Sequence, residues 1–246
     1  TMELCHVDYS FKPIKPIVTM ERPILEQSLL STHNPLFYGA MPNLGLYSQP
    51  DGPFPNPAEL LPQGKIDEAK ASYEATVDTA VRDILYATNA MWESGADGIN
   101  LDTVGAAGDA DFQASLIASE KIKEKYPDCC VELGMAGEFI LGMHSELEYD
   151  GVRLAGLYPH DQVKLAEKAG VTIFGPVVNT NTSESCPWNL SRSITFMKEC
   201  SKVANIPIHV NMGMGVGAVP VTDHPPVDVV SRASKAMVEI CRLDGL

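Results

Sequence analysis

The sequence predicts an α/β protein of the (β/α)8 TIM-barrel type, with the barrel incomplete in this chain. From Gly98 onward, strand candidates begin roughly 30 to 40 residues apart, which is the spacing of βα units. A helix end, a glycine and a new strand recur at Ala96-Asp97-Gly98, Lys168-Ala169-Gly170 and Leu243-Asp244-Gly245. About seven strand candidates follow one another without a reversal signal, which favours a barrel over a doubly wound sheet.

The strand candidates are short runs in which apolar residues alternate with polar ones or dominate. We expect them at Met2–Tyr9, Pro35–Met41, Gly98–Thr103, Cys130–Met135, Val171–Phe174 and Ile206–Asn211, with another beginning at Leu246. Helical periodicity and start or stop residues predict helices at Ile24–Leu30, Ile66–Ser94, Asp109–Lys125, His160–Ala169, a segment opened by Ser185-Cys186-Pro187, and Val227–Leu243. A loop and a short helix are expected to hold Glu138, His144 and Glu146.

Composition narrows the class of protein. The chain has 246 residues, 45% of them hydrophobic, and a formal net charge of −14. Such an acidic protein is a poor partner for nucleic acid or an anionic membrane. No apolar run is long enough to span a bilayer and no signal peptide is visible, so we expect a cytoplasmic protein without a membrane segment. The six cysteines form no CxxC pair, which favours buried thiols in a reducing compartment.

In barrels of this type, the functional residues follow the carboxyl ends of the strands. That rule selects a polar, glycine-rich ring of residues that includes Asp102, Glu132, Glu138, Asn179, Asn181, His209 and Asn211, together with Asp8, Tyr38, Asn43, Thr103 and Thr180. Each has a structural alternative: Asp102 can cap the next loop, Glu138 can sit at a helix N-terminus, and His209 can be a satisfied core histidine. Glu132 lies inside an apolar strand, so it needs a partner or a raised pKa, and a raised pKa suits an acid or base near neutral pH.

Other familiar motifs are missing or misplaced. Gly213-x-Gly215-x-x-Ala218 superficially matches a dinucleotide fingerprint, but prolines follow where that motif needs a helix. No phosphate-binding GxxxxGK[ST] sequence or nucleophile elbow occurs. We predict no metal site, because no His-Cys cluster has zinc-ligand spacing.

Several stretches resemble the dimethylamine:corrinoid methyltransferases, and the resemblance covers essentially the whole chain. These stretches are Met2–Pro13 (MELCHVDYSFKP), Asp102–Asp109 (DTVGAAGD), Gly134–Glu138 (GMAGE), Leu141–His144 (LGMH), Met212–Gly217 (MGMGVG) and Arg232–Glu239 (RASKAMVE). The resemblance implies a barrel that transfers a methyl group from dimethylamine to the Co(I) corrinoid of a separate carrier protein during methylamine-dependent methanogenesis. It also implies a pyrrolysine directly after an Asp-Gly-(Leu or Ile) sequence such as Asp244-Gly245-Leu246.

From this resemblance, residues 1–246 are expected to be a single (β/α) barrel domain that lacks its C-terminal part and an N-terminal region. The chain would stop just before the pyrrolysine and would be inactive alone. Glu132 and Glu138 are predicted to be the acid/base residues or ammonium partners, with a pocket shaped by Asp102, Asn179, Asn181, His209 and Asn211. We expect no directly bound cofactor, since the corrinoid (cobalamin) belongs to the carrier, and we expect a homo-oligomer.

Two alternatives stay open at this point. The chain can be another TIM-barrel enzyme, either a pterin-dependent methyltransferase or a lyase, that binds its substrate through Asp102, Asn179 and Asn181. It can also be an inactive fragment that only binds the corrinoid carrier, in which case salt should weaken the contact between its acidic surface and a basic patch.

Overall fold

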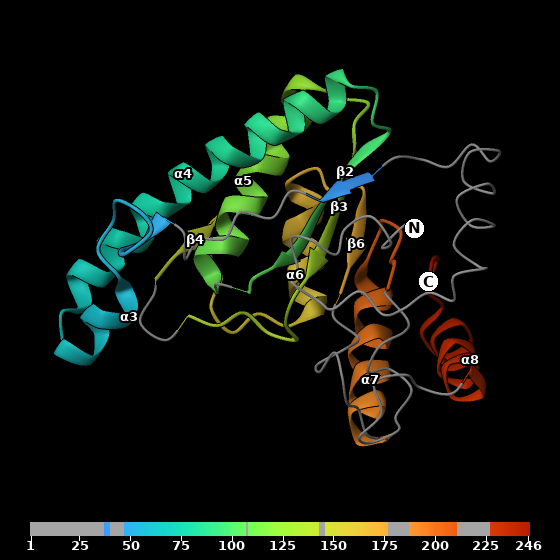
Figure 1. The fold of residues 1–246 in the computed structure, drawn as a ribbon. Helices are drawn as coiled ribbons and strands as arrows, with labels where there is room; N and C mark the ends of the chain where they lie inside the picture. Colours follow the sequence, from blue (N-terminus) through green and yellow to red (C-terminus); the bar gives the residue numbers. More distant parts are fainter. Residues whose placement is uncertain (1–36, 40–46, 107, 143–145, 177–186, 211–226) are drawn as a thin grey trace, which may run out of the picture.

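The computed structural model describes residues 37–39, 47–106, 108–142, 146–176, 187–210 and 227–246 (Figure 1). Within them, the strands β1 (Phe37–Gly39), β2 (Gly98–Val104), β3 (Cys130–Met135) and β6 (Ile173–Gly175) form a parallel sheet. Parallel bridges from Phe174 to Ile208 and from His209 to Gly245 continue the sheet. An α/β protein with a parallel sheet, as the sequence predicted, is thereby confirmed.

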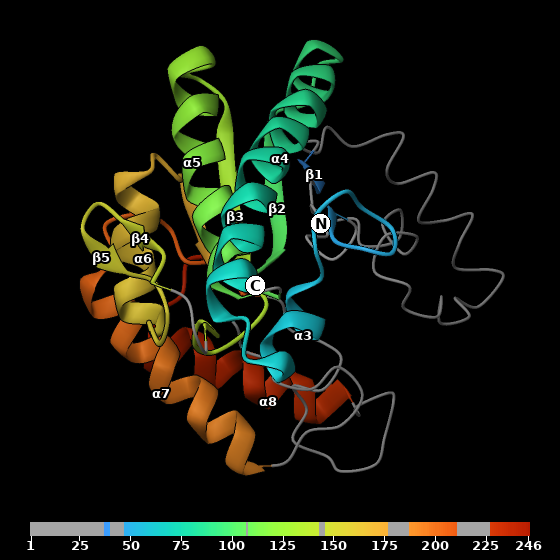
Figure 2. The ribbon, with the colours of Figure 1, turned by 90° about the vertical axis from the view of Figure 1, so that its left-hand side faces the viewer.

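Helices connect these parallel segments in chain order. They are α4 (Ile66–Glu93), α5 (Asp109–Lys125), α6 (Pro159–Lys168), α7 (Pro187–Val203) and α8 (Val227–Ala236), which continues into a π-helix, η4 (Met237–Cys241). A short helix, α3 (Pro57–Leu60), and the 3₁₀ turn η3 (Leu61–Gln63) precede α4. Right-handed crossovers between neighbouring parallel strands place the connecting helices on one face of the sheet. Figures 1 and 2 show α4 running alongside α5, and η4 packs against α7.

Most of the predicted elements in the described ranges occur close to their expected bounds. The helix expected at 109–125 and the strand at 130–135 have the predicted limits, and the long helix ends one residue early, at Glu93. The strands Met2–Tyr9 and the helix Ile24–Leu30 lie outside the described residues.

The described part of the segment after β3 is not helical, while His144, which the predicted loop and short helix were also to hold, lies outside the described residues. Residues 136–142 do not form the expected short helix, because their backbone groups bond to other segments: Ile140 N–H donates to Leu157 O, and Leu141 O accepts from Asp109 N–H. An antiparallel hairpin follows, β4 (Glu148–Tyr149) and β5 (Val152–Arg153), separate from the main sheet. Asp150 and Gly151 both have positive φ at its turn, a combination typical of two-residue hairpins.

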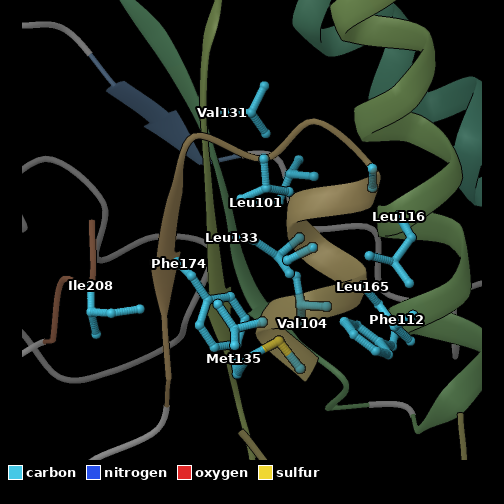
Figure 3. Close-up of a cluster of buried hydrophobic side chains, with 14 of the residues drawn as sticks. Leu101, Val104, Phe112, Leu116, Val131, Leu133, Met135, Leu165, Phe174 and Ile208 are labelled. Atoms are coloured by element: carbon cyan, nitrogen blue, oxygen red, sulfur yellow. The ribbon is translucent and has the colours of Figure 1, made fainter. Parts of the chain in front are cut away.

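The helix-facing side of the sheet carries the main core (Figure 3). Alternate strand residues point to it, as the two-residue period of a strand requires. Its fully or nearly fully buried members include Ile99, Leu101, Val131, Leu133, Phe174 and Ile208 from the sheet, and Phe112, Leu116, Leu165, Met197 and Met237 from the helices. Each buried side chain of this size stabilises the fold by roughly 1.5–3 kcal/mol relative to exposure.

The same period sends the intervening residues to the opposite face. Asn100 and Asp102 alternate with Leu101 on β2, and Glu132 and Gly134 alternate with Leu133 on β3. We call this side the inner face, and Asn100 and Glu132 are direct register partners on it. Polar side chains therefore gather on one side of a sheet whose other side is apolar.

Two segments that carry the family resemblance pack tightly against each other. Asp109 N–H donates to Leu141 O at 2.9 Å, and Asp111 Oδ2 accepts from Gly105 N–H at 2.9 Å. A Cβ on Gly142 would lie 2.6 Å from Asp109 Oδ2 and 2.7 Å from Ala155 Cβ. The loop after β2 and the segment after β3 can therefore approach this closely only with glycine at position 142.

Replacing Gly142 with alanine should lower the free energy of unfolding by about 1–3 kcal/mol, as overpacking does in a close-packed interior. Urea denaturation would measure the loss. Gly137→Ala is the matched control in the same segment, where the nearest atom to an added Cβ is Phe139 O at 3.3 Å. A Gly142→Ala protein no less stable than this control would contradict the steric argument.

The described cysteines behave as buried thiols. Cys129, Cys200 and Cys241 are buried, Cys130 is half-buried, and all four are free. Burial raises the pKa of the Cys200 thiol to about 12 and that of Cys241 to about 11, from an ordinary 9.0. The prediction of buried, unpaired thiols is confirmed at these three buried positions, while Cys5 and Cys186 lie outside the described residues.

This burial predicts a loss of stability in alkali. Between pH 9 and 12 the two thiols ionise in the unfolded chain but stay protonated in the folded one, so their contribution is intact below pH 9 and falls as pH rises. Urea midpoints at about pH 8 and pH 10 should therefore differ more for the natural protein than for a Cys200→Ala, Cys241→Ala double variant. Equal pH dependence in the two proteins would rule the thiols out as its source.

Candidate functional site

The centre of the inner face is a contact between a glutamate and a histidine. Glu132 lies in the middle of β3 and is 7% exposed. Its Oε1 is 2.5 Å from His209 Nδ1, while the His209 backbone N–H donates to Phe174 O at 3.0 Å. The buried carboxylate thus has the partner that its place in an apolar strand requires. Neither side chain is simply a core residue, because both lie opposite the apolar face.

The segment Asp244–Leu246 lies beside this pair. Val210 N–H donates to Gly245 O, Gly245 N–H donates to Ile208 O, and Asp244 Oδ2 accepts from Ile208 N–H at 2.9 Å. A Cβ on Gly245 would lie 3.2 Å from His209 Cδ2. The Asp-Gly-Leu sequence named by the resemblance therefore runs directly alongside His209.

Asp102 lies at an irregularity near the end of β2. Its Oδ1 accepts from Thr103 N–H at 2.7 Å, so it does cap the turn, as one interpretation of the sequence proposed. Thr103 has φ of +57°, and the register between β2 and β3 shifts between Leu101 and Val104. Left-handed backbone is rare and strained for a β-branched residue, and bulges that redirect side chains are common beside active sites.

Glu138 occupies a different position from Glu132. It lies three residues beyond the end of β3 and is 6% exposed, and its Oε2 forms an ion pair with Arg192 of α7. The Arg192 guanidinium also lies 5.6 Å from the Phe196 ring centroid. Glu138 is therefore not the helix N-terminal carboxylate that the sequence allowed, and its cationic partner comes from a helix 54 residues away.

Sequence reasoning missed Asn100 and Arg192. Asn100 Oδ1 is buried and has no hydrogen-bond partner within the described part of the chain. The strand alternation that placed Asp102 on the inner face also places Asn100 there, so this signal was present. Arg192 carried no such signal, because it is an ordinary position on a helix.

The remaining predicted site residues, Asn179, Asn181 and Asn211, lie outside the described residues. Among the residues that are described, no three His, Cys, Asp or Glu side chains come together in a way that could hold a metal ion. None of the described helices is both long and apolar enough to cross a membrane. The described site thus consists of Asp102, Glu132 and His209 on the inner face, with Glu138 beyond the end of β3.

A comparison with protein families identifies a family that matches this chain. The model of the family described as Dimethylamine methyltransferase (Dimeth_PyL) matches residues 1–246, which is the entire sequence.

Proposed function

Because this chain belongs to the dimethylamine methyltransferase family, we propose that it transfers a methyl group from dimethylamine to the Co(I) corrinoid of a separate carrier protein. Monomethylamine is the other product, and the reaction serves methylamine-dependent methanogenesis. The observation that carries the proposal is the Glu132–His209 contact on the inner face, next to Gly245. Family membership also favours this enzyme over a pterin-dependent methyltransferase or a lyase.

We propose that the sheet is part of a (β/α)8 barrel and that residues 1–246 belong to one barrel domain. Strand neighbours that follow chain order support this, because a doubly wound sheet reverses its strand order at a switch point. The polar inner face would then line the barrel interior near the carboxyl ends of the strands, where barrel enzymes carry their active sites.

The proposed chemistry must overcome a poor leaving group. In the family that the chain resembles, a pyrrolysine supplies an electrophilic imine that holds the amine. We propose that the pyrrolysine occupies the position after Leu246. Binding in a fixed orientation supplies much of the rate enhancement. When bound through its carrier protein, the Co(I) corrinoid would supply the nucleophile to which the methyl group is transferred.

The described residues would bind the amine and exchange a proton with it. Glu132 holds His209 through Nδ1, so Nε2 is the ring nitrogen that would exchange a proton with the amine. The Glu132 carboxylate also stabilises positive charge on the imidazole or on a bound ammonium. We propose Glu138 as a second acid/base or ammonium partner, oriented by Arg192. Asp102, Asn179, Asn181 and Asn211 would complete the pocket.

We propose the cognate corrinoid carrier as the protein partner, and self-association into a homo-oligomer. The net charge of −14 would steer a basic patch on the carrier toward this protein, with a rate that falls as salt rises.

The test is methyl transfer with purified components. The protein is produced from its gene in a host that inserts pyrrolysine, and separately as the 246-residue chain. Each is incubated with dimethylamine and reduced corrinoid carrier, and methylcorrinoid and monomethylamine are measured. We expect both products only with the first preparation. Methylation by the 246-residue chain would contradict the role of pyrrolysine, and no methylation by either would contradict the proposed function.

A further inference from the structure

The place that a side chain at Gly134 would fill lies on the inner face beside Glu132, and we call this place the hollow. A Cβ built on Gly134 would lie 3.4 Å from Asp102 Oδ1 and 3.7 Å from Asn100 Oδ1. Two oxygen acceptors from β2 therefore border the same small space, into which Gly134 projects no side chain. The register partner of Gly134 on the next strand is Gly175, where a Cβ would lie 3.2 Å from Gly134 Cα, so the two strands come close together there.

Asn100 lacks a hydrogen bond that its burial calls for. Its Oδ1 is buried without a partner among the described residues, and a buried polar atom left in this state destabilises the fold. Buried acceptors of proteins are almost always satisfied, by protein, water or ligand. Its place next to Glu132 in the register puts this acceptor in the proposed site.

Asp102 is held at the hollow by strained backbone. Its Oδ1, the oxygen that borders the hollow, also accepts from Thr103 N–H, whose φ is +57°. A carboxylate has two oxygens with about four lone-pair sites, so it can accept several hydrogen bonds at once, one from Thr103 N–H and one from a ligand among them. The bulge thus orients one anionic acceptor next to the neutral acceptor of Asn100.

We infer that this hollow binds the ammonium group of dimethylammonium, with one N–H donated to Asn100 Oδ1 and the other to Asp102 Oδ1. The inference rests on the proposed function and adds a specificity determinant to it. Dimethylammonium has two N–H donors, which match the two acceptors. Trimethylammonium has only one, so it would leave one buried acceptor unsatisfied. A site whose buried acceptors match the N–H donors of its ligand rejects an analogue that lacks one of those donors.

The test measures amine binding by saturation-transfer NMR titration at neutral pH, where both amines are protonated. The natural protein should bind dimethylammonium chloride more tightly than trimethylammonium chloride. Asn100→Leu removes an acceptor at similar volume and should weaken dimethylammonium binding about tenfold or more, since hydrogen bonds to charged groups are among the stronger ones. The same change should reduce the ratio between the dissociation constants of trimethylammonium and dimethylammonium. Asn89→Leu, on the surface of α4, is the matched control and should change neither value.

Gly134→Ala gives a second variant that should fold. The added methyl group makes only ordinary van der Waals contacts, yet it occupies the hollow. We expect it to weaken the binding of both amines while the urea midpoint stays near that of the natural protein.

The inference is overturned if the natural protein shows no preference between the two amines, or if Asn100→Leu and Gly134→Ala bind them as the natural protein does. Methyl transfer by the natural protein would in that case leave the proposed function intact. Binding with the expected preference, but without methyl transfer, would instead contradict the proposed function and keep the ammonium site.

Discussion

Replacing Glu132 with glutamine should slow dimethylamine-dependent methylation of the corrinoid carrier by about 100-fold or more, the usual contribution of a positioned acid or base. Glutamine keeps the shape of the side chain and an oxygen that can accept from His209 Nδ1. It removes the negative charge that would stabilise a protonated imidazole or a bound ammonium. The fall should therefore appear in kcat at saturating dimethylamine, measured as the initial rate of methylcorrinoid formation.

Glu120→Gln is the matched control for this variant. Glu120 also has a short hydrogen bond, from the Tyr149 hydroxyl at 2.6 Å, but it lies on the outer surface of α5. It should retain the rate of the natural protein. If Glu132→Gln kept the natural rate and its pH profile, Glu132 would be a structural partner of His209 and the proposed acid/base role would be wrong.

Replacing Phe174 with alanine should lower the free energy of unfolding by about 3–5 kcal/mol, the range measured for large aromatic side chains truncated in cores. Phe174 is fully buried, and its ring lies in the middle of the cluster in Figure 3. The backbone of the same residue accepts from His209 N–H and donates to Pro207 O. A cavity at this point would therefore also disturb the strand that holds His209.

Phe139→Ala is the comparison, because Phe139 is 43% exposed. Its ring is 6.0 Å from that of Tyr158, so its loss should cost well under half as much as the loss of Phe174. Denaturant unfolding of both variants would measure the difference. A loss of less than about 1 kcal/mol at Phe174 would mean that the core collapses around the missing ring, contrary to the close packing proposed for it.

The sequence predicted the repeating part of this fold well, and the physical reason is local. The strand at 130–135 alternates apolar residues with polar or small ones, and the helix at 109–125 lies between Gly108 and Pro127, so short-range signals set their limits. The hairpin of β4 and β5 has two residues in each strand, too few to show a period. Its Asp150-Gly151 turn was the one available signal.

The candidate site was predictable only where it depends on strand position. The sequence pattern selected Glu132 and His209 separately, because each lies in or at the end of a predicted strand. That the two side chains contact each other could be known only from the register of the strands in the sheet. Strand alternation alone could have placed Asn100 on the inner face, but its position beside Glu132 follows only from the register between β2 and β3. The Glu138–Arg192 pair depends on how α7 packs near the segment after β3, which no local pattern encodes.

The chain order of the sheet has a consequence for synthesis on the ribosome. Within the described part of the main sheet, each strand pairs with the preceding strand of that sheet, so the sheet can grow one βα unit at a time as the chain emerges. Glu132 and His209 are 77 residues apart, so Glu132 is translated well before its partner. In a nascent chain that ends between β6 and His209, β3 is already paired on both sides but the Glu132 carboxylate still lacks its imidazole partner, so the proton-handling pair is completed only when the later segment joins the sheet.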